Sequence, residues 1–221
     1  MVEFLNHFVM CIAGPRRSGK SHLIKSMLKN ELKKKFKPEN IFIFCPSIDL
    51  NDDFKEFSQA RKFNEPKPEI INDIMRECQH NIKVYGKQRT PNVLIIFDDC
   101  LDTNIMKFNG ILDKIASRGR HMKISMIAVS QRISGISRTI RLNSDYFLIF
   151  SPFNLSESEQ FLEQYVLKRY RKEMGKIILD IWKKKHSFIF VDNSEYDSTK
   201  KIKEGFDKVI QIMDSQALSE E

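Results

Sequence analysis

The fold is decided by a glycine-bordered loop of eight residues, Gly14-Pro15-Arg16-Arg17-Ser18-Gly19-Lys20-Ser21. It fits G-x-x-x-x-G-K-[ST], the Walker A pattern of phosphate-binding loops. An apolar run at residues 7–13 precedes the loop and a helical pattern follows it, which is the context that this motif requires. The glycines let the backbone turn tightly, so that N–H groups and the start of the following helix can face phosphate oxygens. We predict that Lys20 reaches the β- and γ-phosphates of a nucleotide and that the Ser21 hydroxyl ligates Mg²⁺.

The predicted nucleotide-binding residues are the whole loop and the residue that follows it. They are Gly14, Pro15, Arg16, Arg17, Ser18, Gly19, Lys20, Ser21 and His22. The motif itself does not fix the identity of Arg17 or His22. The expected cofactors are ATP and Mg²⁺.

A second motif, which is acidic, follows about 80 residues after the phosphate loop. Residues 93–97 form an apolar run that is followed by Asp98 and Asp99. The carboxyl end of a buried strand is where polar function gathers in α/β proteins. We predict that Asp98 holds Mg²⁺ as a Walker B aspartate and that Asp99 orients and deprotonates the attacking water. A helix N-cap is the alternative role for Asp99.

The next apolar run, residues 124–129, ends in Ser130-Gln131. A side-chain amide at that strand end would lie beside the two carboxylates. Gln131 could hold the attacking water or sense the γ-phosphate. The alternative is a surface glutamine that opens a loop.

Basic residues precede the same strand, in Arg118-Gly119-Arg120-His121. They belong at its amino end, on the opposite edge of the sheet from the phosphate loop. An arginine there is expected to miss its own nucleotide and to reach a neighbour's in a ring. A solvated basic turn is the alternative, and Arg138 and Arg141 form a second candidate pair.

Short apolar runs alternate with helical patterns along the chain. The runs that predict buried strands are 7–13, 41–45, 93–97, 124–129, 146–150 and 187–191. The helical patterns are 21–35, 105–117, 156–168, 173–185 and 200–213, of which 156–168 opens on a capping-box pattern, Ser156 with Glu159. Continuous apolar strands between helices predict a three-layer α/β domain of the P-loop NTPase (RecA-like) type, with a mostly parallel central sheet.

Length and composition are consistent with this fold. The 221 residues, 41% of them hydrophobic, predict one domain over residues 1–215 and a frayed tail at 216–221. Residues 51–90 are polar and predict an irregular insertion on the sheet edge with one helix near 69–80. No apolar run is long enough for a membrane span. The four cysteines, which lack metal-ligand spacing, are predicted to be buried reduced thiols. A net charge of +8 weakly favours a polyanionic partner.

The order of these motifs is similar to that of the genome-packaging ATPases of poxviruses and giant DNA viruses, in the FtsK–HerA superfamily. The residues that carry the resemblance are the Walker A loop, Asp98-Asp99, Arg118-Gly119-Arg120-His121 and Ser130-Gln131-Arg132, with weaker likeness at Arg141-Leu142-Asn143 and Phe190-Val191-Asp192. The resemblance implies an ATP-hydrolysing motor that carries double-stranded DNA, whatever its sequence, into a preformed capsid.

The resemblance also implies partners and roles. It implies a homo-oligomeric ring, pentamer or hexamer, a capsid or portal-like vertex protein as partner, and a location in the viral factory of the host cytoplasm or in the virion. Gln131 becomes the polar sensor and Arg120 the leading arginine finger, although the superfamily differs in where its finger lies.

Three other classes of protein could account for part of this pattern. A small P-loop nucleotide or nucleoside kinase would need an arginine-rich lid, and residues 51–90 hold only three scattered arginines. A GTPase would need a base-reading Asn/Thr-Lys-x-Asp motif, which is missing. A non-enzymatic nucleic-acid binder would not need Lys20, Ser21, Asp98 and Asp99 together. The kinase, or another nucleic-acid-dependent P-loop NTPase, remains the alternative.

Overall fold

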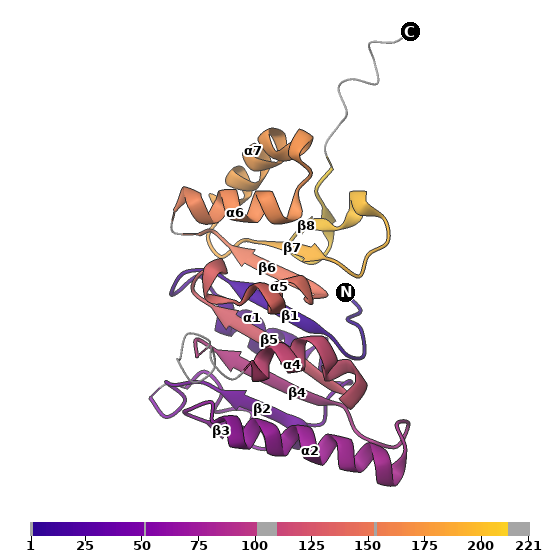
Figure 1. Ribbon diagram of the computed structural model, residues 1–221. Helices are drawn as coiled ribbons and strands as arrows, with labels where there is room; N and C mark the ends of the chain where they lie inside the picture. Colours follow the sequence, from indigo (N-terminus) through magenta and orange to yellow (C-terminus); the bar gives the residue numbers. More distant parts are fainter. Residues whose placement is uncertain (1, 51, 101–109, 153, 212–221) are drawn as a thin grey trace.

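A computed structural model describes residues 2–50, 52–100, 110–152 and 154–211, and in these ranges one nine-stranded sheet organises the chain (Figure 1). Its strands are β1 (Val9–Ala13), β2 (Ile41–Phe44), β3 (Arg61–Phe63), β4 (Val93–Asp98), β5 (Ile124–Ser130), β6 (Tyr146–Phe150), β7 (Phe188–Asp192), β8 (Ile202–Glu204) and β9 (Lys208–Val209). Their order is β3-β2-β4-β5-β1-β6-β7-β8-β9. Strands β1 to β6 pair in parallel, and β7, β8 and β9 pair antiparallel at one edge. The predicted α/β class with a mostly parallel sheet is confirmed.

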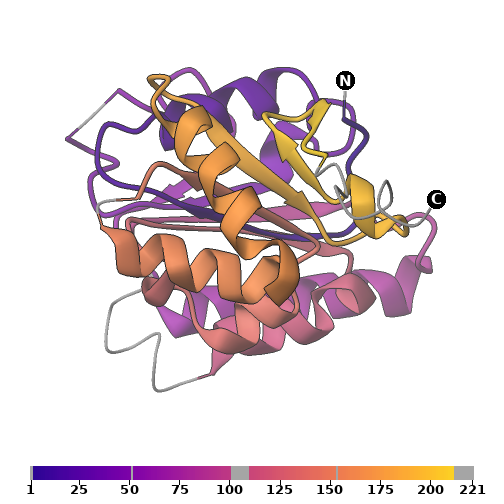
Figure 2. The ribbon, with the colours of Figure 1, turned by 90° about the horizontal axis from the view of Figure 1, so that it is seen from above.

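Helices cover both faces of the sheet (Figure 2). They are α1 (Lys20–Lys29), α2 (Pro68–Tyr85), α4 (Ile111–Arg118), α5 (Arg138–Leu142), α6 (Leu155–Tyr165) and α7 (Arg171–Trp182), with short 3-10 turns at Pro38–Asn40, Gly119–Met122, Ile133–Gly135, Lys168–Tyr170 and Ser198–Lys200. Apolar side chains of α1 pack on one face, in a cluster that also contains Phe36 and Phe54. The other helices contribute to a second cluster on the opposite face. The two clusters enclose the sheet in three layers, as predicted.

The six predicted strands all form, because each apolar run is buried on both faces of the sheet. Residues of β1, β4, β5 and β6 are buried without exception. Strand β5 lies between β1 and β4. The strand that feeds the phosphate loop and the strand that ends in the two aspartates are therefore not neighbours, and the end of β5 lies between their carboxyl ends.

One helix prediction is wrong. Residues 200–213 were expected to be helical, but in the described part of this segment the chain forms β8 and β9. Gly205 adopts a left-handed φ of 61° between the two strands, which favours a tight turn over a continuing helix. Its N–H donates to the Phe188 carbonyl, so the segment pairs with the free edge of β7 and extends the sheet. Tertiary pairing overrides the local helical pattern here.

Several element boundaries also differ from expectation. Helix α1 ends at Lys29, and turns carry the chain onward to Phe36, where 21–35 was expected to be one helix. Helix α6 begins at Leu155, because the Asn154 side chain accepts the N–H of Glu157; Ser156 is not the cap. The insertion 51–90 contains the predicted helix as the longer α2, and an edge strand, β3, that was not predicted. The first part of the 105–117 prediction lies outside the described residues.

All four cysteines are buried thiols, as predicted, and none of them forms a disulfide within the described residues. Among the helices of the described residues, none combines the length and hydrophobicity of a membrane span.

Candidate nucleotide-binding site

The phosphate loop joins β1 to α1 and is held by its own lysine. Lys20 Nζ donates to the carbonyl oxygens of Gly14 (2.7 Å) and Pro15 (3.0 Å), and the residue is only 6% exposed. The Gly14 N–H donates to the Ser130 carbonyl at the end of β5. Two of the three N–H donors of the ammonium group therefore close the loop, and the third is left for a ligand.

Gly14 is required by close packing and Gly19 by its backbone conformation. A Cβ at position 14 would lie 2.7 Å from the Cβ of Phe150, which cannot swing away because it is fixed to the backbone. Gly19 has a φ of 110° and caps the amino end of α1. Arg17 also adopts a left-handed φ, 63°, so the loop bends where no glycine is present.

The loop has the chemistry of a phosphate cradle. The Ser18 hydroxyl is buried and has no hydrogen-bond partner among the described residues, which is costly unless a ligand supplies one. Lys20 retains a free donor, and the amino end of α1 adds its partial positive charge. Ser21 and His22 lie in the first turn of α1, Ser21 half-buried and His22 exposed. The residues present fit the triphosphate of a nucleotide.

The two aspartates lie at the end of β4, beside the loop. Asp98 is 6% exposed, and burial, with the charge of Asp99 as the second cause, raises the pKa of Asp98 to about 6. Burial lowers the pKa of Lys20, and the charges of Asp99 and Asp98 oppose this shift. The ammonium and the carboxylates thus share one electrostatic environment. A buried carboxylate with a raised pKa, next to a second carboxylate, fits a divalent cation.

Gln131 joins the aspartates, as the sequence predicted. Its side-chain amide donates to Asp99 Oδ2 at 3.3 Å. The Asp99 N–H donates to the Val129 carbonyl of β5, which places Asp99 across the strand end. Asp99 is exposed and adopts a left-handed φ of 52° that turns the chain sharply after β4. The structure therefore brings Asp99 and Gln131 together at the same sheet edge as Lys20.

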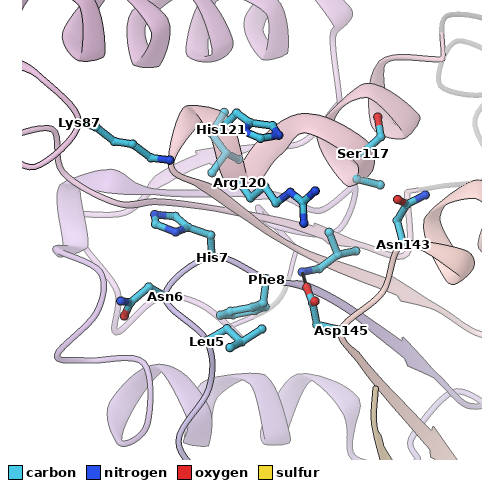
Figure 3. A pocket seen from close by; sticks show the side chains of 13 residues that line it. Leu5, Asn6, His7, Phe8, Lys87, Ser117, Arg120, His121, Asn143 and Asp145 are labelled. Atoms are coloured by element: carbon cyan, nitrogen blue, oxygen red, sulfur yellow. Dashed lines mark hydrogen bonds between the residues drawn. The ribbon is translucent and has the colours of Figure 1, made fainter. Parts of the chain in front are cut away.

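Arg120 lies at the amino ends of the strands, opposite the ends that hold the phosphate loop and the aspartates. It belongs to the Gly119–Met122 turn, directly before β5, and lines an open cavity of about 560 Å³ at the amino ends of the strands. Figure 3 shows its side chain extending into this cavity, with His7 and Asp145 on the far side. The Asp145 carboxylate accepts the Val9 N–H, and Arg120 is one of the groups that lower its pKa against the larger effect of burial.

The other candidate arginines differ in how they are held. Arg141 donates to the Ile136 carbonyl and to Gln164, so its guanidinium clamps α5 to its surroundings. Arg118, Arg120 and Arg138 are exposed, and within the described ranges none of them makes a hydrogen bond or ion pair through its side chain.

The sequence did not predict two further residues of the site. The Cys45 thiol donates to Asp98 Oδ2 at 3.9 Å, and it could have been found because Cys45 directly follows β2, the neighbour of β4. His186 Nδ1 lies 3.0 Å from the Ser18 carbonyl, and no motif marks it. Within the described ranges, no three His, Cys, Asp or Glu side chains gather as a metal site of their own.

The fold and this edge of the sheet define a P-loop ATPase. Comparison with family models shows that the chain belongs to the poxvirus A32 protein family, whose model matches residues 4–214.

Solved structures show the same fold. The genome packaging NTPase B204 of Sulfolobus turreted icosahedral virus 2, in complex with AMP, is 14% identical with a TM-score of 0.66, over 95% of this chain and 100% of that chain. B204 of Sulfolobus turreted icosahedral virus, a DNA-packaging ATPase, is 19% identical with a TM-score of 0.63, over 94% and 100%. The pCW3 conjugation coupling protein TcpA with ATPγS is 15% identical with a TM-score of 0.61, over 86% and 59%. No curated protein matches the chain.

Proposed function

We propose that this protein is an ATP-hydrolysing motor that moves double-stranded viral DNA into a preformed capsid. The observation that carries the proposal is the meeting of Lys20, Asp98, Asp99 and Gln131 at one edge of the sheet, in a member of the poxvirus A32 family. The fold shared with the two B204 packaging enzymes supports it. Residues 1–215 would act as a single motor domain.

The residues divide the chemistry of hydrolysis among them. The loop amides bind the phosphates, and the Lys20 ammonium group neutralises charge that develops on the transferred group. Asp99, exposed at the strand end, takes the proton of the attacking water, and the Gln131 amide fixes the orientation of that carboxylate. The Mg²⁺ that accompanies ATP would be held by Asp98 and the Ser21 hydroxyl, and when bound it neutralises phosphate charge.

The motor function is tested by ATP hydrolysis in the presence of DNA. Random-sequence duplexes should stimulate hydrolysis and compete equally for binding, because a pump contacts phosphates and not base edges. Binding should weaken steeply as salt rises. Phosphate transfer to a nucleoside, with no response to DNA, would instead support the kinase alternative.

The packaging role needs a test in the virus. When the Lys20→Ala variant is the only copy of this protein, the virus should assemble capsids that contain no DNA. DNA-filled capsids under these conditions would contradict packaging. The capsid or vertex partner, and a place in the viral factory or virion, are part of this proposal.

We further propose that each active site is completed by the neighbouring subunit in a ring. The seven residues of β5 span about 20 Å at about 3.3 Å per residue, and they separate Arg120 from the edge that holds Gln131. An arginine side chain covers only a fraction of that length. Arg120 would therefore reach the nucleotide of a neighbour, where such arginines contribute about 10³–10⁵ in rate.

A mixing experiment tests this shared site. Lys20→Ala and Arg120→Ala should each be inactive, but mixed rings contain interfaces with both halves intact and should recover activity. Lys114→Ala, an exposed cation on the helix before Arg120, is the matched control and should stay active. Mixed rings that form and remain inactive would exclude Arg120, and Arg118 and Arg138 would be tested next.

A further inference from the structure

The turn between α7 and β7 contacts the phosphate loop from the far end of the chain. His186 Nδ1 lies 3.0 Å from the carbonyl oxygen of Ser18, 168 residues away in sequence. A carbonyl can only accept, so Nδ1 carries the proton and donates it. His186 also lies against the loop glycine: a Cβ on Gly19 would be 3.4 Å from His186 Nδ1. Nothing in the Walker A motif requires this histidine.

The turn holds His186 in a conformation that a free chain would rarely adopt. Its φ is 63°, in the left-handed region. The next residue fixes the turn: Ser187 Oγ donates to the carbonyls of Ile181 (2.7 Å) and Lys184 (2.8 Å). The end of α7 and the start of β7 therefore present the imidazole to the loop as a preformed donor.

Peptide geometry links this contact to the nucleotide site. The peptide unit between Ser18 and Gly19 is planar and trans, so its C=O and N–H point in opposite directions. A donor that holds the Ser18 carbonyl on the outside of the loop thus turns the Gly19 N–H toward the inside. In the described residues this N–H donates to no other group. It is therefore available to a phosphate oxygen.

We propose that His186 is a positioning residue of the ATPase: it fixes the Ser18–Gly19 peptide so that the Gly19 N–H faces the phosphates. The inference rests on nucleotide binding at the loop, which is part of the proposed function. It also means that His186, outside every motif of the sequence, helps to form the site.

Four substitutions separate the hydrogen bond from the other properties of His186. Asn carries an amide nitrogen in the place of Nδ1 and tolerates a left-handed φ. Gln carries its amide one bond further out, and Ala removes the donor. Gly removes the donor while relieving the backbone, so it shows whether strain alone matters. Lys185→Ala removes a neighbouring exposed charge from the same turn and serves as the matched control.

The measurements are the Kd of a fluorescent ATP analogue and the steady-state kinetics of ATP hydrolysis. His186→Ala, His186→Gln and His186→Gly should raise Kd and KM by about 3- to 10-fold, the range for loss of one hydrogen bond. The value of kcat should stay within about twofold, because the loop binds phosphates alike in ground and transition states. His186→Asn and Lys185→Ala should bind like the unchanged protein.

Two results would overturn the inference. One is wild-type affinity in His186→Ala and His186→Gly; the other is an asparagine variant as weak as the alanine variant although its denaturation midpoint is unchanged. Either result would leave the proposed function intact, provided that Lys20→Ala abolishes binding in the same assay. If the unchanged protein does not bind the ATP analogue, the proposed function itself fails.

Discussion

Replacing Asp98 by asparagine is expected to stabilise the protein while it destroys the activity. The carboxyl group is buried, and its pKa is raised from 3.8 to about 6 by burial and by the charge of Asp99. Between pH 3.8 and about pH 6, Asp98 therefore keeps its proton in the folded state but has lost it in the unfolded chain. Stability falls as pH rises through this window, and the full cost is present above pH 6.

The size of the effect follows from the shift. About two pKa units, at about 1.4 kcal/mol each, correspond to about 3 kcal/mol of lost stability at neutral pH. Asparagine carries no charge and keeps an oxygen that can accept from the Cys45 thiol. Asp98→Asn should thus gain up to about 3 kcal/mol, or about 6–12 °C in Tm for a domain of this size.

Urea denaturation at pH 8 and pH 4, without nucleotide and with a metal chelator, measures this gain. At pH 4 the difference should shrink below about 1 kcal/mol, because Asp98 is then largely protonated in the folded protein. Asp99→Asn is the control. It should give a smaller gain in stability than Asp98→Asn, because burial, the larger cause of the raised Asp98 pKa, remains. Equal midpoints at pH 8, or a gain that does not change with pH, would refute the reasoning.

Three further predictions concern the same edge of the sheet. Lys20→Ala should lower ATP turnover by about 10²–10³ or more, measured as phosphate release, and near-normal turnover would refute the phosphate-loop assignment. Asp99→Asn should still bind ATP with Mg²⁺ but hydrolyse it slowly, because an amide cannot take a proton; an unchanged kcat would favour a purely structural Asp99. Gly14→Ala should weaken nucleotide binding and cost about 1–3 kcal/mol of stability by overpacking against Phe150. Gly175→Ala, inside α7, should not lower stability, because its Cβ would meet only the end of the Leu162 side chain, at 3.2 Å, and alanine favours the helix.

The sequence predicted the buried strands and two parts of the candidate site, the phosphate loop and the aspartates, for a physical reason. Parallel strands covered on both faces must be continuously apolar, and their polar ends must meet at one edge. The loop after Ala13 and the aspartates after Phe97 could be read from this rule. The contact of Gln131 with Asp99 was predicted too, because each residue follows a predicted strand directly, and it forms because β5 lies beside β4 in the sheet.

Two features were not predicted, because they depend on contacts between distant parts of the chain. Residues 200–213 have a helical spacing of apolar side chains, but the free edge of β7 offers backbone groups that the local pattern does not contain. His186 was missed because a histidine after three lysines has no signature, and only the tertiary fold brings it to Ser18. Long-range contacts decide both cases, so a reading of short windows could not have found them.

Strand β5 connects the two halves of the proposed shared site. At its carboxyl end, the Ser130 carbonyl accepts from Gly14, the Val129 carbonyl accepts from Asp99, and Gln131 follows. At its amino end, the turn that carries Arg120 is packed tightly, because a Cβ on Gly119 would lie 3.0 Å from the Ile124 carbonyl. A fully buried strand between two such fixed ends transmits displacement better than a loop would. If Arg120 acts on a neighbour's nucleotide, β5 connects the end of the sheet that holds one active site to the residue that completes the next.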